Sequence, residues 1–427
     1  MSNSKVSAAA IGAWLLVAIY YFYQYALRSA PSVMMPQLTQ AFGVSALGVS
    51  AIVGMFYYGY SPFSLVAGAA IDRFGAKRIV PIGAALVGGG AILFGTGNVT
   101  AANVGRFLQG AGGVFALVGA VYLVTKNFPA AMAASFIGAT QMFGMAGGSA
   151  GQFLVGPIIK GGLPWGRFWI FAGVLGLAIS LALVLLLPNE SKKSEVKRSG
   201  LGKILSSLKD VFLNPQSILC GLISGLLFIP TTIFGMTWGV RFLQEARGRE
   251  YEAAVTLAAT VPLGWMIGCP LCGFISDRIG RRKPVILAGI LMLLGIFAWV
   301  LFGNPAILRG WVVGVAMGIV SGVAMLPYTI IKEANPPELG GSATGVINFI
   351  NFTFSALLGP VFGARLMREP SETEISNLAH YQSGFQPLLY GILGALILAL
   401  FLRETGPAVR SSTAAEAINR QTIKTPS

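Results

Sequence analysis

The stretches AGAAIDRFGAKR at 67–78 and CGFISDRIGRRK at 272–283 repeat one pattern in the two halves of the chain. In each stretch a Gly precedes an Asp-Arg pair by four residues, and a second Gly and a cluster of Lys and Arg follow the pair. The repetition predicts two related halves, each with a charged loop at the same place.

The chain around these stretches is apolar. Of its 427 residues, 55% are hydrophobic and only 11% are charged, and the mean hydropathy is +0.72. Soluble globular domains carry about 25% charged residues. The composition therefore excludes an ordinary soluble protein and indicates a polytopic membrane protein.

Twelve windows are long and apolar enough to cross a bilayer as helices, which takes about 20 residues each. We therefore expect an all-α polytopic membrane protein with twelve transmembrane helices in two six-helix bundles. The expected spans are 8–30, 47–70, 79–97, 100–125, 132–159, 168–187, 216–240, 253–275, 284–302, 308–331, 341–366 and 385–402.

A polar segment near the midpoint separates six spans from six. It contains apolar residues at helical spacing opposite Lys203 and Lys209, which predicts an amphipathic helix on the cytoplasmic membrane surface. Two six-span halves in one chain are typical of transporters built from parallel repeats. The expected divisions are an N-terminal bundle 1–188, a linker 189–214, a C-terminal bundle 215–404 and a disordered tail 405–427.

The net charge of +15, from 30 Lys and Arg against 15 Asp and Glu, follows the topology. Most of the basic residues fall on the side that carries both termini and the two charged loops. By the positive-inside rule this side is cytoplasmic, so we expect a multi-pass protein of a bacterial inner membrane that contacts lipids. No compact basic domain with interleaved aromatic residues is left, which argues against a nucleic-acid partner.

Three cysteines invite a metal or redox interpretation. Cys269 and Cys272 form a CPLC motif, but Cys220 lies in another apolar span and the only histidine, His380, falls in a distant loop. We interpret the cysteines as small buried residues and expect no metal and no cofactor. The sequence has no phosphate-binding loop of the Gly-x4-Gly-Lys type and no nucleophile near a histidine, so it does not favour an enzyme.

The two charged loops suggest a mechanical role at the membrane surface. The first Gly of each would let a neighbouring helix approach closely, and the second would allow a tight turn. The Asp can pair with an Arg and accept hydrogen bonds from a helix N-terminus, which would form a latch. A charge cluster that only fixes topology is the alternative. The candidate gating residues are Gly68, Asp72, Arg73, Gly75, Gly273, Asp277, Arg278 and Gly280.

These loops, GAAIDRFGAKR and GFISDRIGRRK, resemble the cytoplasmic loop motif of the major facilitator superfamily, and the resemblance extends over the whole chain. NVGRFLQGAGG in the fourth span is similar to that family's Arg-x-x-Gln-Gly motif, carried here by Arg106, Gln109 and Gly110. The resemblance implies a secondary transporter in which two six-helix bundles rock around a central site. It places Arg106 at a buried position that serves either proton coupling or structure.

The substrate site is expected among polar residues inside the spans, because a charge in mid-membrane costs about 2.5–3.5 kcal/mol. Arg28 is the first candidate, and Tyr21, Gln24 and Tyr25 share its helix face. An Arg that extends to the far interface behind an aromatic belt is the alternative. The secondary candidates, whose alternative is a helix-packing hydrogen bond, are Gln141, Trp238, Asn348 and Asn351.

Acidic residues are expected outside the membrane core. All 15 Asp and Glu fall in loops, at span ends or in the tails. A cavity lined by Arg and Tyr without a carboxylate favours an anion, because nothing in it would balance a bound cation. We therefore expect a substrate that carries a carboxylate or is an anionic chelate.

Within the superfamily, the runs at 20–50 and 57–78 resemble magnetosome-membrane transporters and bacterial porters related to the lysosomal dipeptide transporter. The first resemblance implies iron supply, in chelated form, to magnetosomes, and other magnetosome membrane proteins as partners. The second implies a porter for a small organic anion or dipeptide. A transporter fold that serves membrane assembly or sensing without transport is the alternative from another class.

Overall fold

The computed structural model describes residues 7–188, 201–303, 310–366, 368 and 377–408. The predictions of a linker before residue 201 and of a disordered tail beyond residue 408 therefore lie outside the described residues. The same holds for the side chain of Asp72, a candidate gating residue.

The first half of the chain forms helices that match the first six expected spans. Two of these spans are extended by short helices, α2 before α3 and α7 after α6. The elements are α1 (Ala8–Ser29), η1 (Ala30–Val33), α2 (Met35–Phe42), α3 (Ala46–Phe74), α4 (Ala76–Gly95), α5 (Val99–Asn127), α6 (Ala130–Phe153), α7 (Val155–Lys160) and α8 (Trp165–Leu186).

The second half follows the same plan after the amphipathic helix α9 (Leu201–Leu213). The seventh span continues from an α-helix through a π-helical segment into a further helix, and the tenth is interrupted by a 3-10 turn. The elements are α10 (Pro215–Ile229), η2 (Pro230–Trp238), α11 (Gly239–Glu245), α12 (Tyr251–Ile279), α13 (Lys283–Phe302), α14 (Gly310–Ser321), η3 (Gly322–Met325), α15 (Leu326–Glu333), η4 (Pro337–Leu339), α16 (Gly340–Leu366) and α17 (Asn377–Leu400).

Among the described residues, 11 helical segments are long and apolar enough to span a membrane, and the pair α2–α3, bent by 102°, brings the number to as many as 12. The predicted fold class, an all-helical polytopic membrane protein, is confirmed. One detail differs, because His380 lies in α17 rather than in a loop. Its buried ring nitrogen is 2.9 Å from the Leu366 carbonyl oxygen.

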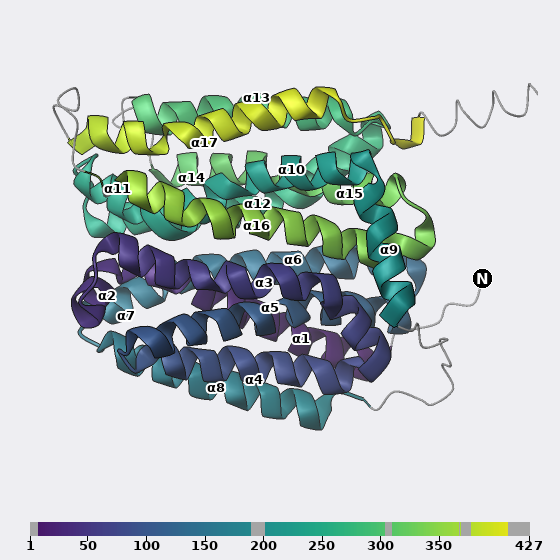
Figure 1. Cartoon of the computed structure of the whole chain (residues 1–427), viewed down its shortest axis with the longest axis horizontal. Helices are drawn as coiled ribbons and strands as arrows, with labels where there is room; N and C mark the ends of the chain where they lie inside the picture. Colours follow the sequence, from purple (N-terminus) through teal and green to yellow (C-terminus); the bar gives the residue numbers. More distant parts are fainter. Residues whose placement is uncertain (1–6, 189–200, 304–309, 367, 369–376, 409–427) are drawn as a thin grey trace, which may run out of the picture.

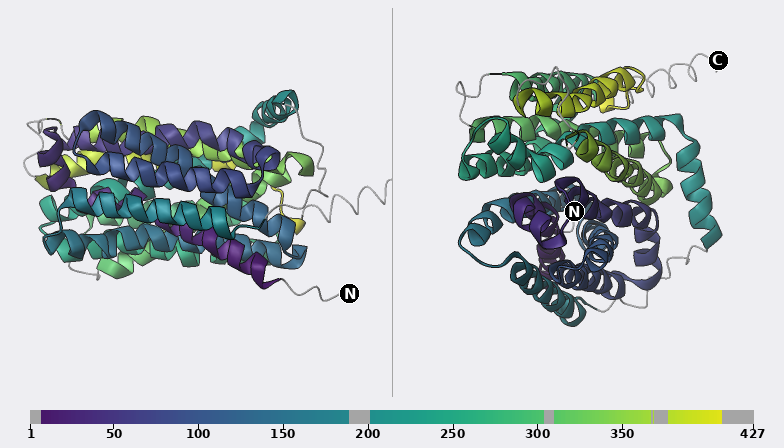
Figure 2. Two further views of the ribbon diagram at one scale, coloured as in Figure 1. Left: turned by 90° about the horizontal axis from the view of Figure 1, so that it is seen from below. Right: turned by 60° about the vertical axis from the view of Figure 1, so that its left-hand side comes forward.

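The helices form two bundles that lie side by side (Figures 1 and 2). Helices α1–α8 make up one bundle and α10–α17 the other, and α9 lies across one end. We call this end, at the right of Figure 1, the motif end because both loop motifs lie there. The opposite end is called the far end. Between the bundles, α3 packs along α16 and α6 packs along α12.

Small residues let the second and fourth spans of each half touch through their backbones. A Cβ atom added to Gly110 of α5 would lie 1.8 Å from the Phe56 carbonyl oxygen of α3. In the other half, a Cβ on Gly318 of α14 would lie 2.0 Å from the Val261 carbonyl oxygen of α12. Only Gly fits such contacts, and their recurrence shows that the two halves are built alike.

The second Gly of each loop motif makes a turn with positive φ. Gly75 separates α3 from α4 with φ 85° and ψ 152°, and Gly280 ends α12 with φ 71° and ψ 12°. The expectation for the first Gly is wrong. A Cβ on Gly68 or Gly273 would meet no atom within 4 Å, so neither residue is needed for a close helix contact.

Candidate functional site

Arg28 lies between the two bundles, although it is close to the far end of α1. Its side chain is only 2% exposed, so it does not extend to the membrane surface as the alternative interpretation required. Five rings surround the guanidinium carbon, with centroids 4.9–5.6 Å away. Those of Tyr25, Phe56 and Tyr57 belong to the first bundle, and those of Phe228 and Phe352 belong to the second.

The guanidinium of Arg28 is poorly satisfied. Its Nε donates a long hydrogen bond of 3.4 Å to the Tyr57 hydroxyl. Its two terminal nitrogens have no hydrogen-bond partner among the described residues. Ring faces attract a cation, but they do not replace hydrogen-bond acceptors. A buried charge without such acceptors is costly, which makes Arg28 a candidate for binding an anionic ligand.

Arg106 of α5 is also fully buried, but all three of its nitrogens are engaged. It donates to the Val53 carbonyl oxygen through Nε and Nη2, both at 3.3 Å. Its Nη1 donates to the Leu27 carbonyl oxygen at 3.2 Å and to Gln109 Oε1 at 2.7 Å. These contacts tie α5 to α1 and α3, so the geometry favours the structural role over coupling.

A cavity of about 210 Å³ lies on the motif-end side of the rings around Arg28. Three of those rings, of Tyr25, Phe228 and Phe352, form its inner wall. The cavity extends to Lys332 and Gly341, near the motif ends of α15 and α16. A ligand entering from the motif end would thus meet the rings before it reached Arg28.

The cavity wall differs between the two bundles. The first bundle contributes aliphatic side chains and Gln141 from α5 and α6, together with tyrosines and Ser64 from α1 and α3. The second bundle contributes polar side chains from α15 and α16, together with Phe228, Met325 and Phe352. The aliphatic residues are Leu117, Val118, Val121, Ile137 and Met145, and the polar ones are Tyr328, Lys332, Thr344 and Asn348.

The sequence-predicted site residues are only partly brought together. Tyr21, Tyr25, Gln141 and Asn348 line the cavity, and the Tyr21 hydroxyl donates to Gln141 Oε1 at 2.8 Å. Asn351 lies behind the wall, where its amide donates to the Tyr328 hydroxyl at 3.1 Å.

Two predicted residues point elsewhere. Gln24 is buried against Gly113 of α5, and neither of its amide atoms has a partner among the described residues. Trp238 is buried beside Gly363 and Arg241, away from the cavity-lining residues. Tyr21, Gln24 and Tyr25 were expected on one helix face, but only Tyr21 and Tyr25 line the cavity.

Several residues at the site were not predicted from the sequence. Aromatic side chains in a span are usually interpreted as lipid-facing or packing residues, so no local signal distinguished those around Arg28. Lys332 lies just beyond the expected span 308–331, and its exposed side chain lines the cavity. The missed residues are Phe56, Tyr57, Tyr60, Ser64, Phe228, Tyr328, Lys332 and Phe352.

At the far end, hydrogen bonds between the bundles separate the central site from the surface. Gln152 of α6 donates to the Gly235 carbonyl oxygen of η2, in the other bundle, at 2.8 Å, and to Ser32 Oγ, in its own bundle, at 3.0 Å. The Tyr251 hydroxyl of α12 donates to the Val33 carbonyl oxygen at 2.9 Å. We call these contacts the far-end seal.

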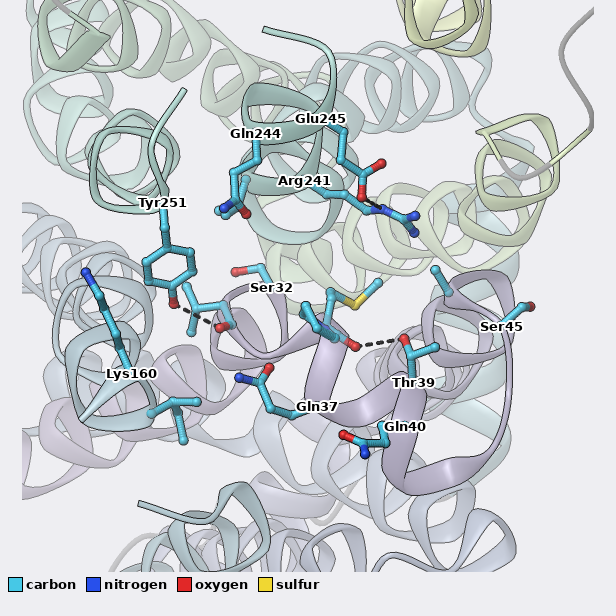
Figure 3. Close-up of a pocket in the computed structure, with 16 residues that line it drawn as sticks. Ser32, Gln37, Thr39, Gln40, Ser45, Lys160, Arg241, Gln244, Glu245 and Tyr251 are labelled. Atoms are coloured by element: carbon cyan, nitrogen blue, oxygen red, sulfur yellow. Dashed lines mark hydrogen bonds and ion pairs between the residues drawn. The ribbon is translucent and has the colours of Figure 1, made fainter. Parts of the chain in front are cut away.

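A wide polar vestibule of about 820 Å³ lies at the seal (Figure 3). Its charged groups are balanced. Arg241 pairs with Glu245 at 2.6 Å, and Lys160 pairs with Glu252 at 2.6 Å. The other labelled side chains in Figure 3 are neutral, so the unbalanced positive charge belongs to the central site rather than to the vestibule.

At the motif end, the second loop motif forms an ion-pair network within its own bundle. Asp277 pairs with Arg282, whereas its neighbour Arg278 is exposed. Arg282 also pairs with Glu333 of α15 at 3.0 Å. Glu404, just after α17, accepts hydrogen bonds from four backbone N–H groups, including those of Arg282 and Lys283 at 2.7 and 3.0 Å.

In the first loop motif, Arg73 is exposed and lies over the Phe74 ring, 5.3 Å from its centroid. The latch expected from Asp and Arg therefore has a described partner network only in the second motif. There it joins three helices of one bundle rather than the two bundles.

Two helical bundles with a buried charged site between them define a membrane transporter architecture. The chain belongs to the Major Facilitator Superfamily, whose family profile matches residues 17–360. It is accordingly a multi-pass membrane protein and a secondary transporter of small solutes, not an enzyme.

The relatives of this chain are distant in sequence, but the alignments cover most of this chain and most of each relative. The 4-hydroxybenzoate transporter PcaK of Pseudomonas putida is 26% identical, over 83% of this chain and 85% of that protein. The probable galactarate/D-glucarate transporter GudP of Escherichia coli is 23% identical, over 82% and 85%. The hexuronate transporter of Bacillus subtilis is 24% identical, over 79% and 83%.

Solved structures confirm the fold. A bacterial homologue of the human lysosomal transporter Spinster, in an inward-facing and unoccupied conformation, has a TM-score of 0.69 and 15% identity, covering 93% of this chain and 97% of that one. The E. coli fucose:proton symporter FucP has a TM-score of 0.63 and 16% identity, covering 93% and 100%.

Proposed function

We propose that this protein transports a small organic anion and that Arg28 binds the anionic group. The main support for this proposal is that the Arg28 guanidinium is buried between the bundles. Both of its terminal nitrogens lack a hydrogen-bond partner among the described residues. A carboxylate would supply two acceptors in the geometry that a guanidinium prefers. It would also neutralise the buried charge.

The relatives support this substrate class over iron. Proteins named for 4-hydroxybenzoate, galactarate and glucarate, and hexuronate all carry organic anions. The expectation of iron supply to magnetosomes gains no support from these comparisons. In the part of the chain that the structure describes, no group of three or more His, Cys, Asp and Glu could hold a metal ion.

The transport cycle follows from the two ends of the site. With the motif end on the cytoplasmic side, the cavity faces the cytoplasm and the far-end seal closes the other route. Binding at Arg28 replaces contacts between the guanidinium and rings of both bundles. It thereby loosens the bundles from one another and favours rocking. Arg106 holds α1, α3 and α5 together during the movement.

The gating role of the loop motifs belongs to the same proposal. Gly75 and Gly280 set the turns, and Asp277 holds Arg282 at the motif ends of α12, α13 and α15. This arrangement makes the motif end of the second bundle rigid, so that the bundle moves as one unit.

Uptake into proteoliposomes tests the function. The purified protein should accumulate labelled organic anions, chosen from 4-hydroxybenzoate, glucarate and a hexuronate, and Arg28→Ala and Arg28→Lys should reduce uptake at least tenfold. Lys keeps the charge but not the paired donors. Arg167→Ala is the control, because Arg167 is exposed at the start of α8. Unchanged uptake in folded Arg28 variants would exclude Arg28 as the anion site.

A second candidate function is sensing. The membrane sensor protein UhpC of Salmonella typhimurium is 23% identical, over 81% of this chain and 82% of that protein. A sensor would bind the anion with Arg28 but would not accumulate it. Ligand-induced thermal stabilisation without uptake would therefore favour sensing over transport.

A further inference from the structure

Lys332 carries the only charge among the described residues that line the central cavity. It lies in the last turn of α15, and its side chain is exposed at the motif-end mouth of the cavity. Arg28 does not line the cavity, because three of the rings around its guanidinium stand in between. In this conformation a solute that enters therefore meets the charge of Lys332 and not that of Arg28.

No described acidic side chain neutralises Lys332. The neighbouring Glu333 belongs to the ion-pair network of the second loop motif, where it pairs with Arg282 at 3.0 Å. Glu333 also accepts a hydrogen bond of 2.6 Å from the Thr405 hydroxyl. Among the described residues, Lys332 itself has no ion-pair or hydrogen-bond partner. Its ammonium group thus offers three donors and an unbalanced positive charge to an anion.

The mouth of the cavity is open between the two bundles. Gly68 of α3 and Gly341 of α16 both line the cavity, and a Cβ atom on either would meet no atom within 4 Å. From Gly341 to Phe352, at the inner end, α16 makes three turns, a distance of about 16 Å along its axis. A small solute at Lys332 therefore has to move inward before it can bind Arg28.

Polar side chains of the second bundle connect the mouth with the inner end. Thr344 and Asn348 line the cavity one turn apart on α16. Tyr328, one turn before Lys332 on α15, lines the same wall. Hydroxyl and amide groups can replace part of the water around an anion, which lowers the cost of moving it inward.

Resting on the proposed function, we infer that Lys332 forms a second anion-binding site at the motif-end mouth, where a carboxylate of the substrate binds before it reaches Arg28. A hydrated ammonium group is a point charge without the paired donors of a guanidinium, so it holds the anion more weakly than Arg28 does. The site raises the concentration of the anion at the mouth and speeds its entry.

Charged thiol reagents test this inference in the full-length protein. Thr344→Cys, in a background without the three native cysteines, places a thiol one turn inside the mouth. The probes are the anionic sulfonatoethyl and the cationic trimethylammonioethyl methanethiosulfonate. Lys332→Gln should lower the ratio of anionic to cationic labelling rates about fivefold or more, because loss of a nearby charge changes the two rates in opposite directions. Lys332→Arg should keep the ratio.

Lys209→Gln is the matched control. Lys209 is exposed on α9, which lies across the same end of the molecule (Figure 1), but it does not line the cavity. This variant should leave the ratio unchanged. A folding defect would change both labelling rates in the same direction. An unchanged ratio in Lys332→Gln, or equal changes in Lys332→Gln and Lys209→Gln, would overturn the inference.

Exchange of labelled glucarate or 4-hydroxybenzoate across proteoliposomes connects the site with transport. Lys332→Gln should raise the concentration that gives half-maximal exchange several-fold and change the maximal rate less, whereas Arg28→Ala should remove exchange at any concentration. If exchange needs Arg28 but neither the labelling ratio nor the half-maximal concentration depends on Lys332, the organic-anion function stands and the mouth site is wrong. If the ratio depends on Lys332 but neither anion is exchanged, the proposed function fails and the anion site at the mouth stands.

Discussion

At the scale of residues, two buried arginines in neighbouring helices serve different purposes. Arg106 finds backbone carbonyls of two other helices, and Arg28 finds ring faces. The difference lies in what surrounds each guanidinium, since both side chains are at most 2% exposed. A buried charge with hydrogen-bond partners stabilises the packing around it. A buried charge without partners lowers the stability of the fold, and a functional role explains its presence.

This contrast predicts opposite effects on stability. Arg106→Met should lower the free energy of unfolding by about 1–3 kcal/mol, because the Leu27 and Val53 carbonyls lose their donor. Arg28→Met should leave stability unchanged or raise it, because it removes a charge that lacks acceptors. Thermal unfolding in detergent, followed by size-exclusion chromatography, measures both. A larger loss in Arg28→Met would contradict the assignment.

At the scale of elements, the loop motifs are turns whose geometry differs between the two copies. Gly280 has the left-handed helical conformation that ends many helices. Gly75 combines positive φ with extended ψ, a region that is essentially restricted to Gly. The two motifs are alike in sequence, but the second Gly of each adopts a different backbone conformation.

We therefore predict unequal tolerance at the two turns. Gly75→Asn should destabilise the protein by about 1–3 kcal/mol, whereas Gly280→Asn should cost less, because Asn adopts the left-handed helical region more readily than other residues do. Thermal stability of the two purified variants provides the comparison. Equal losses would show that the turn conformation is not what limits these positions.

The segment after α17 caps the second motif through one carboxylate. Burial alone would raise the pKa of Glu404, but four backbone N–H groups stabilise the ionised form and the pKa lies below its ordinary value. Because the folded-state pKa is the lower one, this stabilisation is present above the unfolded-state pKa, near 4.5, and is lost as the pH falls through the folded-state pKa.

Glu404→Gln should accordingly reduce stability at pH 7 and make much less difference at pH 3. A Gln oxygen still accepts hydrogen bonds but carries no charge. The check is the difference in unfolding temperature between wild type and variant across this pH range. A difference that does not shrink in acid would mean that the charge of Glu404 is not the source of the stabilisation.

At the scale of the whole molecule, the central cavity and the far-end seal lie on opposite sides of Arg28. The seal depends on a few hydrogen bonds between the bundles, of which the Gln152 amide makes one to the π-helical segment η2. Segments of π-helix are frequent at functional sites. Through this hydrogen bond, Gln152 of the first bundle holds the π-helical segment of the second bundle, so the contact depends on how the two bundles are placed relative to one another.

Gln152→Leu should weaken the seal and raise access from the far end. We expect a cysteine placed at Ser29, which is buried beside Gly148 of α6, to react several-fold faster with an impermeant maleimide applied from that side. The background would lack Cys220, Cys269 and Cys272. Gln40→Leu, an exposed vestibule position, is the control. Equal labelling rates in both variants would show that Gln152 does not hold the seal.

The sequence alone determined the membrane class, the number of spans and the two-part plan, because hydropathy and charge act locally along the chain. It also singled out Arg28 and Arg106 as charges within spans. Only the tertiary structure decided which of them is unsatisfied, that Gln24 turns away from the cavity and that Lys332 faces it. These outcomes depend on the rotation and bending of helices against one another, and a residue's place along the sequence does not specify its neighbours across a bundle.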